Sequence, residues 1–435
     1  MYIKRVAINN VRSLKSLIWE IEEDQCPGWH VIIGDNGSGK STFLKAISFV
    51  LVFEEIEKIR ENWNQWLRKN SPVGRVFVDI LHNEIIDEFS WNDKYFDLTE
   101  MKQSEIEIKP FFRTEARWQR LDTEVVWISQ TFPEGFHSSV MVLSRSKGLF
   151  SCSYGPFRRF TGGDKEQQDS FKSYPRLTAH LSIFGEKVAL TECLDWLQQL
   201  RFKQLEKKEE GNLLNSIIEF VNQSNFLPFN ARIKDISSDG VTFIDGNGCE
   251  LPVEELSDGY RSILSMTFDL IRQLVRVYGF DQVFDPNDPT KIIAPGVVLI
   301  DEIDVHLHPT WQRRIGIWFR EHFPKIQFIV TTHSPLICQA ASVGTVYRLP
   351  QPGSDEQGEM ITGQMLDRLV YGNVLDAYGT EVFGEGITRS EKSKQNLARL
   401  AKLNQKAKHK RLTVTEEEER QKLKAMMPSN PDISN

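Results

Sequence analysis

The segment Gly34–Ser41, GDNGSGKS, constrains the fold of this 435-residue chain more than any other feature. It fits the pattern G-x-x-x-x-G-K-[ST], with the apolar run HVII before it and the helical run TFLKAISFVL after it. In such a strand–loop–helix unit, loop N–H groups surround phosphate oxygens, Lys40 neutralises the β- and γ-phosphates, and the Ser41 hydroxyl binds Mg²⁺. We therefore expect a parallel α/β sheet around a phosphate site. The expected ligands are Gly34, Asn36, Gly37, Ser38, Gly39, Lys40, Ser41 and Thr42.

Two acidic residues follow an apolar strand late in the chain. The run GVVLIDE at 296–302 has the pattern of a strand buried on both faces, and it ends in Asp301 and Glu302. Ligands of α/β sheets bind at the carboxyl ends of the strands. Asp301 is therefore expected to bind Mg²⁺, and Glu302 to orient or deprotonate the water that attacks a phosphate. The alternative is that one of these acids only caps the next helix.

A third apolar strand, FIVTTHSP at 328–335, would deliver His333 to the same sheet edge, where its imidazole can contact a γ-phosphate. A histidine at a strand end can also be purely structural, and that alternative stays open. His306 and His308 lie two residues apart without a third ligand nearby, so we do not expect a metal site there.

The stretch EELSDGYRS at 254–262 is a polar turn that opens a helix over about 260–278. A Gly-containing turn at a helix start presents unpaired N–H groups and the positive end of the helix dipole to an anion. Two interpretations remain at this point. Ser257 and Gly259 either contact a phosphate or form an ordinary N-cap.

Composition excludes several other classes of protein. A formal net charge of −7 argues against a protein that coats nucleic acid along its whole surface. The five cysteines show no paired spacing with one another or with histidine, which argues against a zinc module and suits a reducing cytoplasm. No apolar run approaches the length of a membrane span, so we expect a cytoplasmic protein with no membrane contact.

The C-terminal region is unusually charged. Residues 389–411 carry nine Lys or Arg against one Glu, and EEEE follows at 416–419. Capping boxes at Thr388–Glu391 and Thr415–Glu418 predict two terminal helices. The first helix either binds a polyanion or an acidic partner, or pairs with EEEE. The predicted organisation is a first lobe with the phosphate loop and a β-rich part at 1–160, a helical insertion at 161–225, a second lobe at 226–350 and a helical extension at 351–435.

The motifs NNVRSL, GDNGSGKST, LSDGYRS, VVLIDEIDVHLHP and IVTTHSP occur in the order typical of the RecF/SMC-like branch of ABC-type ATPases. The chain resembles that family over about residues 1–50 and 225–350. The resemblance implies ATP and Mg²⁺ as cofactors and a head-to-tail dimer or larger assembly. In it, Ser257 and Gly259 contact the γ-phosphate bound by the other subunit. The resemblance also implies that Arg12 lies near the nucleotide and that Gln130 contacts Mg²⁺, with an ordinary surface glutamine as the alternative for Gln130.

The resemblance stops at two places. The insertion has room for only a short helical hairpin rather than a long coiled coil, and the segment after the last motif lacks the acidic spacing of a nuclease. This layout resembles the ATPase subunit of Septu-like or retron-associated anti-phage systems, which implies a separate HNH-type nuclease as partner. The alternatives are a RecF-like DNA-repair ATPase that holds DNA through residues 389–411, and a nucleotide-sensing scaffold with little turnover. Arg158 and Arg159 either contact nucleotide or DNA or are solvated.

Overall fold

The computed structural model describes most of the chain, in two compact units, Met1–Gly372 and Asn373–Asn435, which are treated separately. The described residues are 1–59, 62–81, 111–121, 124–133, 148–160, 173–185, 190–223, 226–354, 356–373 and 391–426.

A six-stranded sheet forms the centre of the larger unit, in the order β16-β15-β3-β14-β13-β7. All pairs are parallel except β15 with β16. Every residue of β3, β13 and β14 is buried, because apolar side chains predominate on both faces and both faces are covered. The predicted parallel α/β sheet is therefore confirmed. The strands are β3 (Gly28–Ile33), β7 (Ser151–Tyr154), β13 (Gly296–Ile300), β14 (Ile326–Thr331), β15 (Gly344–Arg348) and β16 (Glu359–Ile361).

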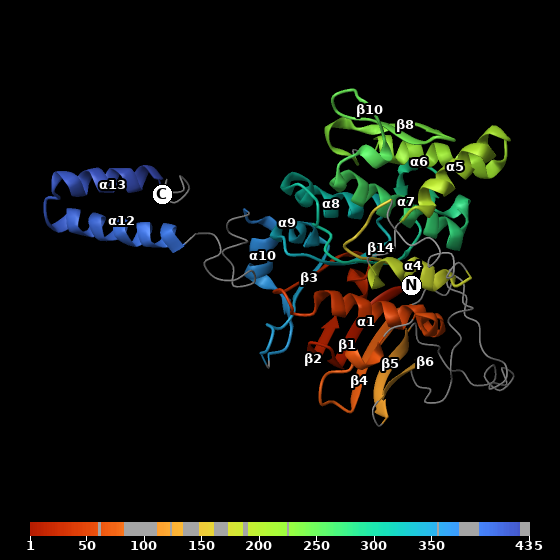
Figure 1. Ribbon diagram of the computed structural model, residues 1–435, viewed down its shortest axis with the longest axis horizontal. Coiled ribbons are helices and arrows are strands. Elements are labelled where there is room, and N and C mark those ends of the chain that lie inside the picture. Colours follow the sequence, from red (N-terminus) through yellow and green to blue (C-terminus); the bar gives the residue numbers. More distant parts are fainter. Residues whose placement is uncertain are drawn as a thin grey trace. The chain divides into compact units, whose positions relative to one another are not determined.

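Helices cover both faces of this sheet. In Figure 1, α1 lies on one side of β3 and β14, and α7 and α8 lie on the other. No helix in the described ranges is long and apolar enough to cross a membrane. The helices of this unit are α1 (Lys40–Val52), α4 (Pro175–Phe184), α5 (Glu192–Leu205), α6 (Asn212–Gln223), α7 (Asp258–Tyr278), α8 (Pro309–His322), α9 (Pro335–Cys338) and α10 (Gly363–Tyr371).

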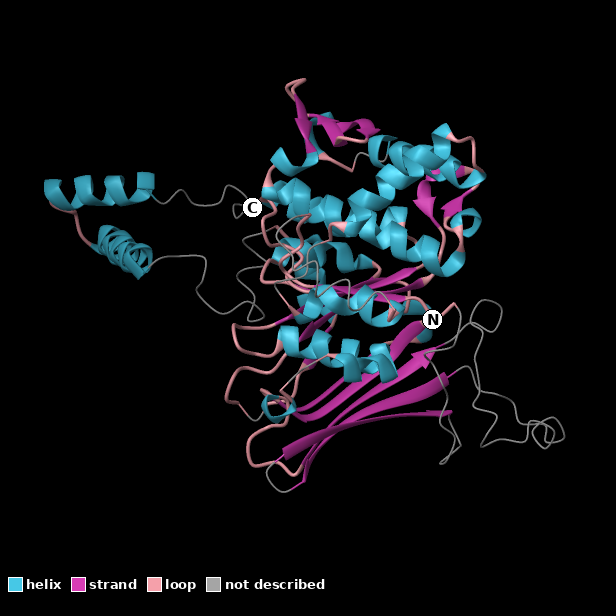
Figure 2. Cartoon of the chain, turned by 45° about the vertical axis from the view of Figure 1, so that its right-hand side comes forward, coloured by secondary structure: helices cyan, strands magenta, loops and turns pink. Residues whose placement is uncertain are grey.

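A five-stranded antiparallel sheet, in the order β2-β1-β4-β5-β6, forms the expected β-rich N-terminal part (Figure 2). Helix α1 packs between the two sheets, and all of its residues except Ser41 and Lys45 are buried, so apolar side chains occur on every side of it. Its Phe49 ring contacts Trp66, with ring centroids 4.4 Å apart. Buried Gln327 of β14 joins the sheets, since its amide bonds both the N–H and the C=O of Ile3 at 2.7 Å. The strands are β1 (Tyr2–Val11), β2 (Leu14–Glu20), β4 (Val73–Leu81), β5 (Phe111–Leu121) and β6 (Glu124–Pro133).

The insertion contains the predicted helical hairpin. Helices α5 and α6 are separated by a single turn at Glu209–Gly211. A small antiparallel sheet, β10-β9-β8, follows and leads the chain into α7. The strands here are β8 (Arg232–Ser237), β9 (Gly240–Ile244) and β10 (Glu250–Pro252), with a separate hairpin of β11 (Phe284–Asp285) and β12 (Asp288–Ile292).

Two segments pack against parts of the chain outside the domain to which the predicted limits assign them. Helix α4 lies within the predicted insertion but packs against β7 and α1, which belong to the central part of the larger unit. Strand β16 and helix α10 lie within the predicted C-terminal extension but belong to the larger unit, because β16 pairs with β15. The smaller unit begins at Asn373.

The smaller unit contains a helical hairpin of α12 (Glu391–His409) and α13 (Val414–Met426). Its apolar contact consists of Leu400, Leu403 and Leu423, with Leu412 packed against them. Ion pairs join Arg399 to Glu419 and Lys406 to Glu416, so part of the basic helix does pair with EEEE.

The capping box predicted at Thr415 and Glu418 is wrong by two residues. The Glu416 N–H donates to Thr413 Oγ1 at 3.3 Å, and the Thr413 N–H donates to the Glu416 carboxylate at 3.0 Å. The helix therefore begins at Val414. Thr388 of the other predicted box lies outside the described residues.

Two histidines are buried in the core, and one gives a pH test of stability. His30 lies between Thr345 Oγ1 at 3.0 Å and Cys26 O at 3.2 Å, and burial lowers its pKa to about 4 from 6.5. The unfolded chain therefore binds one more proton at this residue between those pH values. Stability should fall as the pH drops through this window, by about 1.4 kcal/mol per pH unit for one group.

We expect His30→Gln to weaken the dependence of the free energy of unfolding on pH by the contribution of one proton, because glutamine does not titrate. Denaturant unfolding at several pH values between 4.5 and 7.5 measures the slope for both proteins. Equal slopes would contradict the buried neutral histidine.

Candidate nucleotide-binding site

The loop after β3 has the backbone that phosphate binding needs. Gly37 and Gly39 have φ of +82° and +103°, in the region that side-chain-bearing residues avoid. A Cβ on Gly39 would also lie 2.8 Å from both Leu14 Cδ2 and Ser13 Oγ. The turn between β1 and β2 therefore packs directly against the loop, and α1 begins at Lys40.

Lys40 is buried within this loop. Its Nζ donates to Gly34 O at 2.8 Å and to Asp35 O at 3.1 Å. Burial lowers the pKa of Lys40, and the negative charges of Asp301 and Glu302 oppose that shift. The ammonium group is thus held in a poorly hydrated position, where its attraction for phosphate oxygens is strong.

The loop also fits the group that its sequence implies. Ser38 Oγ is buried and has no hydrogen-bond partner in the described part of the chain, so it can donate to a phosphate oxygen. Ser41 and Thr42 lie in the first turn of α1, where backbone N–H groups have no partner within the helix. Together with Gly34 to Lys40, these residues could hold the phosphates of a nucleotide.

The acidic pair lies at the end of β13 and is oriented by one threonine. Asp301 is 2% exposed, and its Oδ1 accepts a hydrogen bond from Thr331 Oγ1 at 2.6 Å. The same hydroxyl oxygen accepts from the Glu302 N–H at 2.8 Å. Glu302 has φ of +48°, a rare conformation that turns the chain out of the line of the strand. Neither acid caps the next helix, because the cap of α8 is His308.

Strand order brings the three predicted motifs together. Since β14 lies between β3 and β13, the residues after it emerge between the phosphate loop and Asp301. His333 is one of these residues, and its side chain is exposed. Thr332 beside it donates to Asp304 Oδ1 at 2.5 Å, which joins this loop to the segment after the acids.

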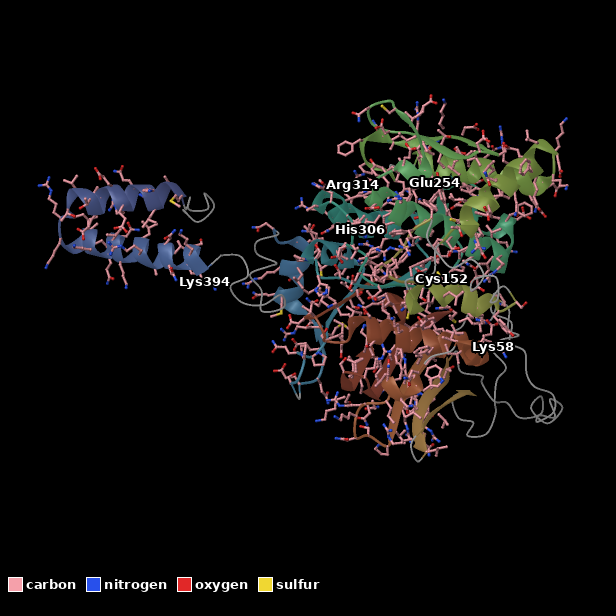
Figure 3. The ribbon with its side chains drawn as sticks, in the orientation of Figure 1. Lys58, Cys152, Glu254, His306, Arg314 and Lys394 are labelled. Carbon is pink, nitrogen blue, oxygen red and sulfur yellow. The ribbon has the colours of Figure 1, made fainter. Side chains whose placement is uncertain are left out.

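The turn at 254–262 leads into α7 as predicted. Ser257 occupies the N-cap position, but its side chain makes no capping hydrogen bond and is exposed. A Cβ on Gly259 would lie 2.8 Å from His306 O, so the helix start packs against the loop after β13. Figure 3 labels His306 and Glu254, which mark these two segments.

The structure places Arg12 and Gln130, the two residues that only the resemblance implied, in different parts of the larger unit. Arg12 lies in the turn that abuts Gly39, with its guanidinium 3.6 Å from the centre of the Trp66 ring. Gln130 lies on the outer strand β6, opposite Glu115 of β5, and its side chain is outside the described part. The strand beside β13 is instead β7, so residues 155–158, Gly-Pro-Phe-Arg, emerge next to the acids.

Sequence reasoning missed the roles of Thr331 and Arg158. Arg158 is 3% exposed and bonds the carbonyl oxygens of Asp301 and Glu302, whereas Arg159 is exposed. The apolar run LFSCSY followed by Gly-Pro was the available signal for β7.

Thr331 gives a direct test of how the acidic pair is positioned. We expect Thr331→Val to slow ATP hydrolysis by about 10- to 100-fold, because both acids lose their shared hydrogen-bond partner. ATP affinity should change little, since Thr331 does not belong to the phosphate loop. Thr331→Ser keeps the hydroxyl and should retain most of the rate. Single-turnover hydrolysis measures this, and a wild-type rate in the valine variant would contradict the assignment.

Comparison with known proteins identifies the family of this chain. Residues 30–339 match the family described as AAA domain, putative AbiEii toxin, Type IV TA system. The chain is 26% identical over 348 residues to Retron Vc95 probable ATPase of Vibrio cholerae serotype O1 biovar El Tor, covering 71% of this chain and 66% of that protein. It is 25% identical over 416 residues to Septu protein PtuA of Bacillus thuringiensis, covering 90% and 89%.

The chain thus spans just under two thirds of the length of the retron relative. Among solved structures, the Smc head bound to the C-winged helix domain of ScpA matches 83% of this chain and 98% of that one, at 15% identity with a TM-score of 0.46. The family match covers more than half of the residues, and the chain therefore belongs to this AAA-domain ATPase family.

Proposed function

We propose that this chain binds and hydrolyses ATP as an ABC-type ATPase, pairs head to tail with a second copy, and controls a separate HNH-type nuclease in anti-phage defence. The observation that carries the proposal is the strand order β3-β14-β13, which gathers Lys40, His333 and Asp301 at one sheet edge. Similarity to proteins named Retron Vc95 probable ATPase and Septu protein PtuA supports the defence context.

Each residue at this edge has a role in phosphoryl transfer. Buried Lys40 counters the charge of the β- and γ-phosphates. The Ser41 hydroxyl and the Asp301 carboxylate would hold Mg²⁺, which neutralises charge between those phosphates. Glu302 orients the attacking water and accepts its proton, and the exposed His333 contacts the γ-phosphate.

Head-to-tail pairing is supported by the start of α7. This helix is 21 residues long, Ser257 and Asp258 at its start are exposed, and the Ser257 hydroxyl is not used as a cap. Arg261 pairs with Asp258, which reduces the negative charge at the helix start. Such a terminus attracts an anion. Ser257 and Gly259 would therefore contact the γ-phosphate held by Lys40 of the second copy.

Mixing two inactive variants tests this arrangement. In the proposed dimer each ATP site has one half from the phosphate loop of one copy and one half from the start of α7 of the other copy. Ser257→Arg damages only the α7 half, and Lys40→Ala damages only the phosphate-loop half. Each variant alone should be inactive. An equal mixture should recover up to about a quarter of the wild-type rate, because half of the dimers are mixed and each mixed dimer has one intact site out of two.

A matched control uses Lys40→Ala mixed with Glu302→Gln, which damage the same half of the site. That mixture should stay inactive. No recovery with Ser257→Arg in dimers shown to be mixed would contradict pairing in trans, and full activity of Ser257→Arg alone would favour an ordinary N-cap.

A second candidate function, a RecF-like DNA-repair ATPase, is favoured by the surface of α12. Lys402, Lys408 and Lys410 are exposed and take no part in the two ion pairs that join α12 to α13. Clustered lysines at a surface attract nucleic-acid phosphates or an acidic protein face. The basic segment 389–411 is thus the proposed contact for DNA or for the nuclease subunit.

We expect replacement of these three lysines by glutamine to weaken association while leaving the ATPase rate unchanged. For a DNA duplex, the slope of log Kd against log salt should fall by about 2 to 3, since each phosphate contact contributes about 0.9. Fluorescence anisotropy measures binding to DNA. Co-purification with the nuclease encoded beside this chain measures binding to the protein partner. Glutamine at the exposed Lys69, Lys207 and Lys325 is the control. Unchanged association in both assays would leave α12 a solvated helix.

A further inference from the structure

Arg158 is a buried cation that makes no hydrogen bond to a carboxylate oxygen among those of the described residues. It follows β7 in the loop at the carboxyl edge of the central sheet, beside the end of β13. The side chain is 3% exposed, and burial lowers its pKa to about 10, so it remains charged at neutral pH. Removing such a group from water costs free energy that its hydrogen bonds must offset.

The guanidinium contacts two different functional segments at once. Its Nη1 donates to Asp301 O at 2.7 Å and to Gly155 O at 2.9 Å, and its Nη2 donates to Glu302 O at 3.0 Å. Its Nε donates to Ser262 Oγ at 3.1 Å. Ser262 is also buried and lies in the second turn of α7, close behind Ser257 and Gly259.

This contact fixes the main chain of the acidic pair from the side opposite to Thr331. Glu302 has the strained φ of +48°, and its N–H bonds Thr331 while its C=O bonds Arg158. Such a conformation persists only where the surroundings enforce it. A planar guanidinium has a rigid set of donors, so displacement of α7 either breaks the Ser262 bond or moves the carbonyl groups of the acids.

In the proposed head-to-tail dimer the two ends of this contact belong to different ATP sites. Ser257 and Gly259 at the start of α7 face the nucleotide of the second copy, whereas Asp301 and Glu302 face the nucleotide of their own chain. We propose that Arg158 is a positioning residue that links the two ATP sites of the dimer. When the nucleotide of the second copy contacts the start of α7, Arg158 aligns Asp301 and Glu302 for hydrolysis of the nucleotide in their own chain. This inference rests on the proposed function.

The test separates this link from a general structural role. Ser262→Ala removes one end of the contact and leaves the three carbonyl bonds, and Arg158→Lys keeps the charge but loses the planar donor set. Ser265→Ala is the matched control, because Ser265 is a buried serine of the same helix whose hydroxyl bonds only Ser262 O. Arg159→Gln controls for loss of a neighbouring positive charge.

The rate of hydrolysis as a function of ATP concentration gives kcat and the Hill coefficient, and a fluorescent ATP analogue gives the affinity. We expect a wild-type Hill coefficient above 1 that falls to about 1 in Ser262→Ala and Arg158→Lys. Arg158→Lys should also lose about tenfold or more in kcat, with affinity within about threefold of wild type. Both controls should keep wild-type cooperativity. Thermal melting reports on folding, and Ser262→Ala remains decisive even where Arg158→Lys is destabilised.

Light scattering of Glu302→Gln with ATP shows whether the dimer forms. An ATP-dependent dimer together with wild-type cooperativity in Ser262→Ala would overturn the link and leave the proposed function intact. Absence of any dimer would overturn the head-to-tail proposal and the link with it. Equal loss of cooperativity in Ser265→Ala would show a general effect on α7 and would also overturn the specific role of Arg158.

Discussion

Parallel pairing of β14 with both β3 and β13 is the constraint on which the rest of the structure depends. Val330 lies opposite Val31 on one side and Ile300 on the other, so the three strands end at nearly the same level. The loops that follow them must therefore meet at one edge. Lys40, Asp301 and His333 meet there although almost 300 residues separate Lys40 from His333 in the sequence. The apolar strands stabilise this edge because both faces of each are buried.

Polar side chains at this edge are held largely by backbone groups, which gives them fixed positions. Thr331 accepts a hydrogen bond from the Glu302 N–H, and Arg158 donates to the carbonyl oxygens of both acids. Lys40 donates to two carbonyl oxygens of its own loop. In the proposed function, nucleotide phosphates replace these last carbonyl contacts of Lys40. The acids, by contrast, are already oriented from both sides, so the protein supplies much of the alignment before a substrate binds.

The surrounding elements connect this edge to the rest of the molecule. Helix α1 carries the phosphate loop at its start and is packed between two sheets, while Gln327 bonds those sheets to each other through Ile3. Helix α7 contacts the segment after the acids through Gly259 and Arg158 through Ser262. The smaller unit has its own apolar contact and ion pairs, and the exposed Lys402, Lys408 and Lys410 take no part in those ion pairs.

The sequence by itself determined the phosphate loop, the acidic strand and the turn before α7, because each is a contiguous pattern whose residues act through their own local backbone. The α/β class and the helical hairpin followed from the same periodicity. Only the tertiary structure decided that β7 lies beside β13, and that Gln130 lies on the outer strand of the other sheet. It also decided that Thr413 rather than Thr415 caps α13, since two candidate threonines differ only in which backbone N–H each can reach. Arg158 and Arg159 are identical residues in adjacent positions, yet one is buried and the other exposed. Two of the partners of Arg158 are carbonyl groups 143 and 144 residues away, and a sequence does not show which backbone carbonyl group a side chain will reach.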